Sequence, residues 1–248
     1  MPRVALVTGS GKKRVGYHVA EALARRGYSV AVHYHTSKPD ALDTVEQFRA
    51  LGVEAEAFPA DLAVEDDVTK LVERVYDRFA RVDVLVNAAA IWERKSLEDL
   101  EAADLLRHFQ TNTLGTFLVS RSVGLRMCQQ TLGGVIVMIG DWATARPYLD
   151  YSGYFPSKAA IPGRTRALAV ELGVRNPNVR VNAILPGPVM LPDEMPQAER
   201  DEAIQATLVK REGTPAHVAH AVLALVDNDF ITGVCLPVDG GRTIYAPD

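Results

Sequence analysis

Residues 3–34 read RVALVTGSGKKRVGYHVAEALARRGYSVAVHY, and this stretch decides the fold. The run Arg3–Thr8 is apolar and β-branched, which predicts a short buried strand. The glycine-rich run TGSGKKRVG leads into an amphipathic segment, 17–26, and then into a second apolar strand, 28–34. Strand, loop, helix and strand within about thirty residues form a βαβ unit, whose two strands must be parallel.

The same alternation continues to the end of the chain. Nearly every predicted strand is apolar on both faces, as expected for a parallel sheet that helices cover on each side. There are no internal repeats or linkers, so residues 1–248 are predicted to form a single doubly wound α/β domain. Further strands are predicted at 53–58, 82–87, 133–140, 179–185 and 234–238, and helices at 38–51, 64–79, 197–210 and 215–226. Residues 100–130 are predicted to be helical, in one piece or two.

Bulk properties exclude several classes of protein. The net charge is −4 and no basic run exceeds Lys12–Arg14, so nucleic acid and anionic membrane are not expected as partners. Cys128 and Cys235 lack metal-ligand spacing, and we expect core thiols in a reducing compartment and no metal site. No apolar stretch approaches the ~20 residues that cross a bilayer, and the N-terminus lacks a signal-peptide pattern. A cytoplasmic protein is expected.

The loop after the first strand is predicted to bind a nucleotide. Ligands of open parallel sheets bind beyond the carboxyl ends of the strands, where Gly9, Gly11 and Gly16 would let the backbone approach phosphate oxygens. The second strand ends in a polar run, 33–38, with no acid until Asp40. Hydroxyl groups and a cation suit a ribose 2′-phosphate, which a carboxylate would repel. NADP(H) is therefore predicted, and the alternatives are a tight strand-to-helix turn and a polar surface loop.

A candidate proton-transfer pair lies later in the chain. Tyr154 and Lys158 are four residues apart and would share one face of a helix, with Asp141 thirteen residues before the tyrosine. A neighbouring ammonium group lowers the cost of forming a phenolate, so the tyrosine could exchange protons near neutral pH. The alternative is a solvated helix face.

Several short motifs occur together in a fixed order. They are Thr8–Gly16 (TG…G), Asp61–Leu62, Asn87–Ala89, Asn112 with Gly115, Tyr154 with Lys158, Pro186–Gly187 and the closing Ile231–Gly241. In this order and spacing they resemble the short-chain dehydrogenase/reductase family over nearly the whole chain. The resemblance implies a Rossmann-type sheet of about seven strands, a nicotinamide cofactor and a homotetramer.

The resemblance also implies roles for individual residues. Tyr154 would donate the proton, Lys158 would bind the nicotinamide ribose and lower the pKa of the tyrosine, and Asn112 would hold a water molecule. The residues expected to bind the cofactor are Gly9, Arg14, Val15, Gly16, His35, Thr36, Ser37, Asp61, Leu62, Asn87, Ala88, Ala89, Tyr154, Lys158, Pro186 and Gly187.

Asp141 occupies the place where this family usually has serine. That exchange, with the HYHTS run at 33–37, Arg14 and Tyr151, resembles the pteridine reductase branch. There, aspartate and tyrosine relay protons to ring nitrogens while NADPH delivers hydride, and a carboxyl group can pass a proton where serine mainly hydrogen-bonds. Ala90 and Ile91 replace the Ser and the stacking Phe of that branch, and Trp92 could supply the stacking face. Substrate contacts are expected from Arg14, Trp92, Asp141 and Tyr151.

The sequence therefore predicts an NADPH-dependent reductase of a pterin, a dihydrofolate or another small conjugated substrate. Residues 187–212, with a proline-rich start and a polar helix, are expected to form a mobile lid over it. One alternative is a carbonyl or 3-oxoacyl thioester reductase of the same family. An alternative of another class is a non-catalytic NADP(H)-sensing protein.

Overall fold

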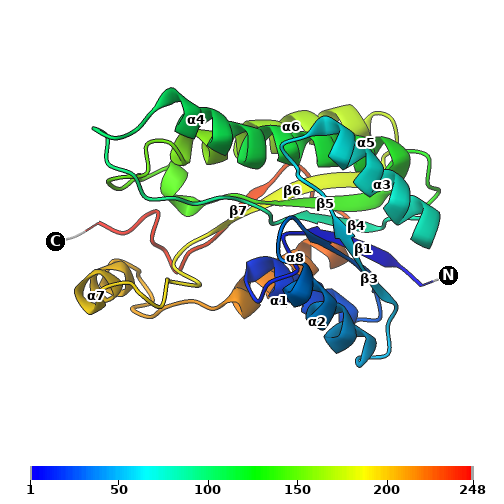
Figure 1. Ribbon diagram of the computed structural model, residues 1–248, viewed down its shortest axis with the longest axis horizontal. Helices are drawn as coiled ribbons and strands as arrows, with labels where there is room; N and C mark the ends of the chain where they lie inside the picture. The colour runs from blue at the N-terminus through cyan, green and yellow to red at the C-terminus, as the bar shows by residue number, and fades with distance from the viewer. Residues whose placement is uncertain (1, 247–248) are drawn as a thin grey trace.

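One seven-stranded sheet runs through the protein, with its strands in the order β3-β2-β1-β4-β5-β6-β7 (Figure 1). A computed structural model describes residues 2–246. Every neighbouring pair of strands is parallel, as the apolar character of both strand faces predicts. The strands are β1 (Val4–Thr8), β2 (Ser29–Tyr34), β3 (Ala55–Pro59), β4 (Val84–Asn87), β5 (Gly134–Ile139), β6 (Val179–Pro186) and β7 (Cys235–Val238).

Helices cover both faces of the sheet and bury a separate apolar core on each (Figure 1). The predicted single-domain, doubly wound architecture is confirmed. Among residues 2–246 no helix has both the length and the apolar surface needed to span a bilayer. One face carries α1 (Val15–Ala24), α2 (Lys38–Arg49) and α8 (Pro215–Asp227), and the other carries α3 (Glu65–Phe79), α4 (Ala102–His108), α5 (Thr116–Met127) and α6 (Phe155–Gly173).

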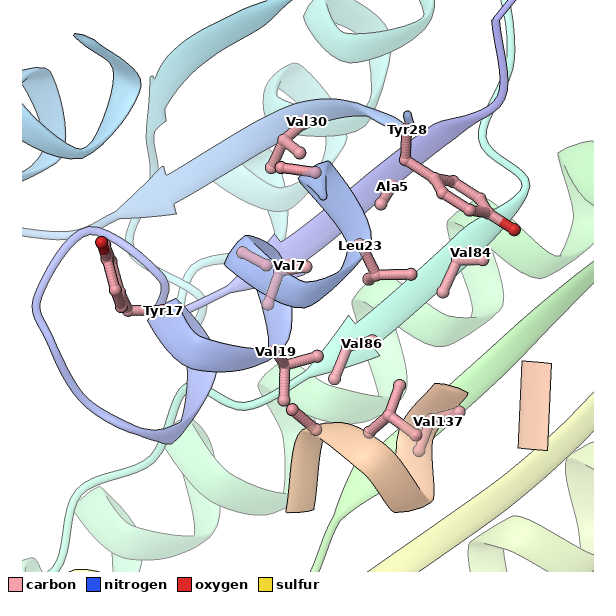
Figure 2. Packing of buried hydrophobic residues seen from close by; sticks show 14 of the residues in the cluster. Ala5, Val7, Tyr17, Val19, Leu23, Tyr28, Val30, Val84, Val86 and Val137 are labelled. Carbon is pink, nitrogen blue, oxygen red and sulfur yellow. The ribbon is translucent and has the colours of Figure 1, made fainter. Parts of the chain in front are cut away.

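The packing of α1 on the sheet fixes the glycine-rich loop. Val19 and Leu23, one helical turn apart, point from α1 towards the valines of the central strands, including Val7 and Val86 (Figure 2). All four side chains are fully buried. Burial of an aliphatic side chain contributes about 1.5–3 kcal/mol relative to exposure. The loop 9–14 is therefore held between two elements, β1 and α1, that cannot shift independently.

The order of the strands places a crevice at the carboxyl ends of β1 and β4. The chain moves outward from β1 to β3 and then returns to β4, which pairs with the other side of β1. Loops leaving these two strands must diverge, which creates the usual ligand position of an open parallel sheet. Thr8 pairs with Asn87 at this end, so the loops that begin at Gly9 and Ala88 lie side by side.

Two predicted helices differ from the structure. Residues 100–130 contain α4 and α5 joined without a break by a π-helical segment, η1 (Phe109–Gly115), which the 3.6-residue period of the sequence does not reveal. The helix predicted at 197–210 is shorter, because α7 (Gln197–Gln205) ends before Thr207 turns into the protein. No side chain of α7 is buried, so little apolar contact supports its further length.

Candidate active site

The side chains of Tyr154 and Asp141 meet beyond the carboxyl end of β5. The Asp141 Oδ1 atom accepts the backbone N–H of Ala143 at 2.8 Å and so caps the short turn η2 (Trp142–Thr144). Tyr154 immediately precedes α6, and its hydroxyl donates to Asp141 Oδ2 at 2.8 Å. The tyrosine is only 4% exposed. The structure thus brings two predicted site residues into direct proton-transfer distance.

Lys158 lies one helical turn after Tyr154 and is fully surrounded by protein. Its ammonium group donates to the Ile139 carbonyl oxygen at 2.8 Å. An ammonium group has three donors, so two remain for a ligand that lies against the end of β5. Burial lowers the pKa of Lys158 to about 8, and the charge of Asp141 opposes part of this change.

The expected lowering of the Tyr154 pKa is wrong for this structure. Burial, followed by the negative charge of Asp141, raises the pKa of Tyr154 well above its ordinary value. The physical reason is that the phenol donates to a carboxylate, while the Lys158 ammonium is engaged by Ile139. Burial also raises the pKa of Asp141, and its hydrogen bonds with the Ala143 N–H and Tyr154 oppose part of this change. Tyr154 therefore stays a hydroxyl donor, and Asp141 is the group placed to restore its proton.

Asn112 holds the surrounding loops in place. It lies within η1, and its amide donates to the Ile91 carbonyl at 2.9 Å and to Ser157 Oγ at 3.0 Å. Its Oδ1 accepts the Ile91 N–H at 2.8 Å. Both amide donors are thus used within the protein, and only acceptor capacity on Oδ1 is left for a water molecule. The water-holding role of Asn112 remains a prediction.

The glycine-rich loop is shaped by close backbone contacts. Gly9 has φ +66°, and a Cβ atom there would lie 2.8 Å from the Ala89 Cα atom. A Cβ atom at Gly16 would lie 2.7 Å from the Gly9 carbonyl oxygen. These two positions therefore require glycine because the loop, the adjacent strand end and α1 pack without space for a side chain. Val15 begins α1, so backbone N–H groups of the first turn face the loop.

The end of β2 carries the polar groups predicted for a 2′-phosphate. His35 and Thr36 are exposed, and Ser37 precedes α2 without capping it, so its hydroxyl is available to a ligand. Arg14 is exposed at the start of α1. A cavity of about 400 Å³ opens between this loop and α3, and its lining includes His35 but also the carboxylates of Asp61, Asp67, Glu73 and Asp77. Thr36 and Ser37 do not line this cavity, and their hydroxyls at the N-terminus of α2 are the groups that fit a phosphorylated ribose.

The remaining predicted cofactor residues lie at or just after the carboxyl ends of strands. The Asn87 amide donates to Ser120 Oγ at 2.9 Å, and its buried Oδ1 has no partner in residues 2–246. The Thr8 hydroxyl accepts the N–H groups of Ala88 and Ala89 at 3.0 and 3.1 Å. A buried acceptor without a partner fits a ligand hydroxyl. The Leu62 side chain is buried in the core, so it is not free to contact a nucleotide. Pro186 is the last residue of β6, and Gly187 packs against Asp239.

A family model described as enoyl-(acyl carrier protein) reductase matches residues 10–243. The chain belongs to the short-chain dehydrogenase/reductase family. Among curated relatives, human 3-oxoacyl-[acyl-carrier-protein] reductase is 34% identical over 97% of this chain and 98% of its own. Pteridine reductase 1 of Leishmania tarentolae is 31% identical over 97% and 96%. A crystal structure of blue fluorescent protein from a metagenomic library in complex with NADPH shares 30% identity over 97% of each chain, with a TM-score of 0.88.

An aromatic wall encloses the Tyr154 centre of this short-chain dehydrogenase/reductase. The rings of Trp92 and Tyr151 are stacked with centroids 4.8 Å apart and planes inclined by 15°. Tyr148 packs edge-on against Tyr151 and Phe155 at 5.1 and 4.9 Å. The face that Trp92 was expected to offer a pterin is therefore covered by Tyr151. A planar substrate must displace Tyr151 or use the opposite face of Trp92.

Sequence reasoning missed two residues that build the dehydrogenase/reductase site. Ser157 accepts from Asn112 and donates to the Tyr154 carbonyl at 2.6 Å, so it joins η1 to α6. His33 is buried; its Nδ1 accepts the Gly9 N–H at 3.0 Å, and its Nε2 contacts the Ala60 carbonyl at 3.1 Å. The serine one residue before Lys158 gave no signal. In the sequence, His33 was counted only as the first residue of the polar run 33–38, although a histidine within a strand that is otherwise apolar is itself a sign of a buried hydrogen-bonding role.

His33 predicts a loss of stability in mild acid. Burial lowers its pKa to about 4 against an ordinary value of 6.5, so the unfolded chain binds the proton more readily between these pH values. Stability is therefore present above pH 6.5 and is lost as the pH falls towards 4. We expect about 2 kcal/mol of the unfolding free energy to be lost through His33 between pH 7 and pH 5.

Urea unfolding at pH 7 and pH 5 measures this contribution. His33→Gln is expected to lose about 2 kcal/mol less than the unsubstituted protein over this interval. His220→Gln, at an exposed histidine of α8, is the matched control. An equal loss in His33→Gln and the unsubstituted protein would contradict the assignment.

Proposed function

We propose that the protein is a reductase of a pterin, a dihydrofolate or another small conjugated substrate. The observation that carries the proposal is the 2.8 Å hydrogen bond from the Tyr154 hydroxyl to Asp141. Reduction of an imine-like bond adds a proton to nitrogen, and this pair offers a hydroxyl donor backed by a carboxyl group. The similarity to pteridine reductase 1 supports the same substrate class.

NADP(H) is the cofactor of this reductase. The Gly9 loop, Thr36 and Ser37 would hold its phosphates, and the two remaining donors of Lys158 would hold the nicotinamide ribose. The unpartnered Asn87 Oδ1 would accept from a ribose hydroxyl. The related structure in complex with NADPH supports this assignment. When bound, the reduced cofactor supplies the hydride.

The protein residues supply the proton. Tyr154 donates its hydroxyl proton to the substrate atom next to the carbon that receives hydride, so one hydride and one proton are added across the double bond. The resulting phenolate regains its proton from solvent by way of Asp141, which lies 2.8 Å from the Tyr154 oxygen.

Residues 187–212 would cover the bound substrate. This segment contains α7, which buries none of its side chains, and it is tied down at its far end by the Arg200–Glu212 ion pair at 2.7 Å. A segment with few buried apolar contacts opens at low cost. We further propose that the protein forms a homotetramer and that it is cytoplasmic. Light scattering of the purified protein at micromolar concentration measures the number of subunits.

A second candidate is a carbonyl or 3-oxoacyl thioester reductase. The specific observation that favours it is the 34% identity to human 3-oxoacyl-[acyl-carrier-protein] reductase over nearly the full length. Trp92 supports it as well, because its stacking face is occupied by Tyr151. The same tyrosine would then protonate a carbonyl oxygen instead of a ring nitrogen.

Measuring the oxidation of NADPH with dihydrobiopterin, dihydrofolate or acetoacetyl-coenzyme A as the substrate tests these functions side by side. Turnover of the ring substrates with a kcat/KM at least tenfold above that of the thioester is expected. The reverse order would select the second candidate. Binding of NADPH without turnover of any ring, thioester, quinone or ketone would contradict both and indicate a cofactor-sensing protein.

Carboxylates placed at the end of β2 are expected to change the cofactor preference. Thr36→Asp or Ser37→Asp places a negative charge where the 2′-phosphate is expected to lie. The kcat/KM for NADPH should fall by about 10- to 100-fold, as expected for loss of a charge-assisted hydrogen bond, while NADH is affected less. Thr131→Asp, exposed at the opposite end of the sheet, is the control. An unchanged NADPH-to-NADH ratio would mean that the phosphate is held elsewhere.

A further inference from the structure

The segment after β7, residues 239–245, lies beside the catalytic centre and has a fixed backbone. The Asp239 carboxylate accepts the N–H groups of Gly241 and Thr243 at 2.9 and 2.7 Å and the Thr243 hydroxyl at 2.6 Å. These bonds hold the chain on both sides of Arg242. In Figure 1 the segment, in red, runs outward on the same side of the molecule as α7. The position of the Arg242 backbone is thus fixed by the hydrogen bonds that Asp239 makes with its two neighbours.

The Arg242 side chain is aimed at the wall of the catalytic centre. Its guanidinium carbon lies 5.1 Å from the centroid of the Trp142 ring. Trp142 follows Asp141 directly, and its ring lies 6.5 Å from that of Tyr148 in the aromatic wall. A guanidinium group stacked on an aromatic face keeps its N–H edges free to bind a planar anion.

Arg146 adds a second cation at the same place. It donates to the Tyr245 carbonyl oxygen, which ties the loop after η2 to the segment 239–245. Arg242 belongs to the segment 239–245 and Arg146 donates to it, so the two guanidinium groups meet at the same short stretch of chain beside Trp142. Burial, followed by the charge of Arg146, lowers the pKa of Arg242. The charge of Glu202 on α7 opposes this effect. Two positively charged side chains, Arg146 and Arg242, therefore lie at this point.

Neighbouring arginines are neutralised, but these two are not. Arg94 pairs with Asp150 at 3.0 Å, and Arg200 pairs with Glu212 at 2.7 Å. Within residues 2–246, neither Arg146 nor Arg242 has a carboxylate oxygen within ion-pair distance. Two neighbouring positive charges that no carboxylate contacts directly favour the binding of an anion between them.

We propose that Arg146 and Arg242 form an anion subsite at the rim of the Tyr154–Asp141 centre, so that the substrate carries a carboxylate or phosphate away from the bond that is reduced. The inference rests on the proposed reductase function and narrows its substrate class. Dihydrofolate, with two carboxylates, fits better than the neutral dihydrobiopterin. Acetoacetyl-coenzyme A, with its phosphates, fits better than the neutral ethyl acetoacetate.

Binding to the protein saturated with NADP⁺ tests the subsite without requiring turnover. Calorimetry with dihydrofolate and acetoacetyl-coenzyme A supplies the carboxylate and phosphate arms, and dihydrobiopterin is the neutral comparison. Arg242→Gln and Arg146→Gln should each weaken at least one charged ligand about 10- to 100-fold and change dihydrobiopterin by less than twofold. Arg242→Lys should recover part of the affinity, because it retains charge but not the planar fork.

The control is Arg175→Gln, about 30 Å from Tyr154 along α6, at an exposed arginine that pairs with Glu171. It should leave all three affinities unchanged. Equal weakening of charged and neutral ligands by both test variants would show that the arginines only support the fold. Failure of both charged ligands to bind the unsubstituted protein would also overturn the proposal.

Failure of the subsite and failure of the proposed function give different results. Turnover of charged and neutral substrates with equal KM in the unsubstituted protein and in both arginine variants would retain the reductase and reject the subsite. Charge-selective binding without oxidation of NADPH would retain the subsite and reject the reductase. Raising the salt concentration from 50 to 500 mM should weaken only the charged ligands.

Discussion

Replacing Tyr154 with phenylalanine is expected to lower kcat by about 10³-fold, because the substitution removes the proton donor and leaves the ring in place. Only the hydroxyl is lost, and among residues 2–246 its one hydrogen-bond partner is Asp141. The packing of the ring against His108, Tyr151 and Phe155 is retained. The dissociation constant of NADPH, measured by fluorescence titration, should change by less than about threefold, since less than about 1 kcal/mol of binding energy is involved.

Tyr17→Phe is the matched control for this experiment. Tyr17 is also buried, and its hydroxyl donates to Gln47 Oε1 at 2.8 Å. Its substitution therefore removes a comparable hydrogen bond away from the Asp141 centre, and kcat should remain within about twofold of the unsubstituted value. A parallel loss of NADPH binding and turnover in Tyr154→Phe would instead identify Tyr154 as a structural residue.

Asp141→Ser is expected to separate ring reduction from ketone reduction. Serine can still cap η2 by accepting the Ala143 N–H, so the local turn should persist. It cannot restore the Tyr154 proton as a carboxyl group can, and kcat for ring C=N bonds should fall by about 100-fold. Ketones need the proton on oxygen, where a serine hydroxyl can polarise the bond, and a loss of less than about tenfold is expected.

The same variant should change the pH profile. The negative charge of Asp141 is, after burial, the main reason that the pKa of Tyr154 is raised. Without it, the alkaline limb of kcat/KM that reports Tyr154 should move to lower pH, and Asp141→Asn should show the same displacement. Equal losses on rings and ketones, together with an unmoved limb, would remove the argument for a carboxyl proton relay.

The parts of the site that depend on local order were predictable from the sequence. Tyr154 and Lys158 at a spacing of four residues, the glycines after β1 and the polar end of β2 all follow from short patterns. The alternation of apolar segments was sufficient to predict the parallel sheet. These features need no knowledge of which distant residues meet, and the structure confirms the parallel sheet.

The parts that depend on distant partners were not predictable. The pKa of Tyr154 is raised first by burial and then by the charge of Asp141, whereas the short pattern suggested that Lys158 would lower it. His33 acquires its role from Gly9, which lies 24 residues away. The stack of Trp92 on Tyr151 joins two loops with no common motif. In each case a tertiary contact decides the chemistry of the side chain.

The π-helical segment η1 (Phe109–Gly115) is expected not to tolerate a change in its number of residues. Deleting one residue there would let the π-helical segment become α-helical. The residues that precede it would then rotate by about 100° about the helix axis and shift by about 1.5 Å along it. Asp104 would then leave Lys95, its partner at 2.5 Å, and His108 would turn away from Tyr154. A shortened protein should therefore fold around the same sheet yet lose its reactive centre, whereas conservative exchanges at unchanged length should be tolerated.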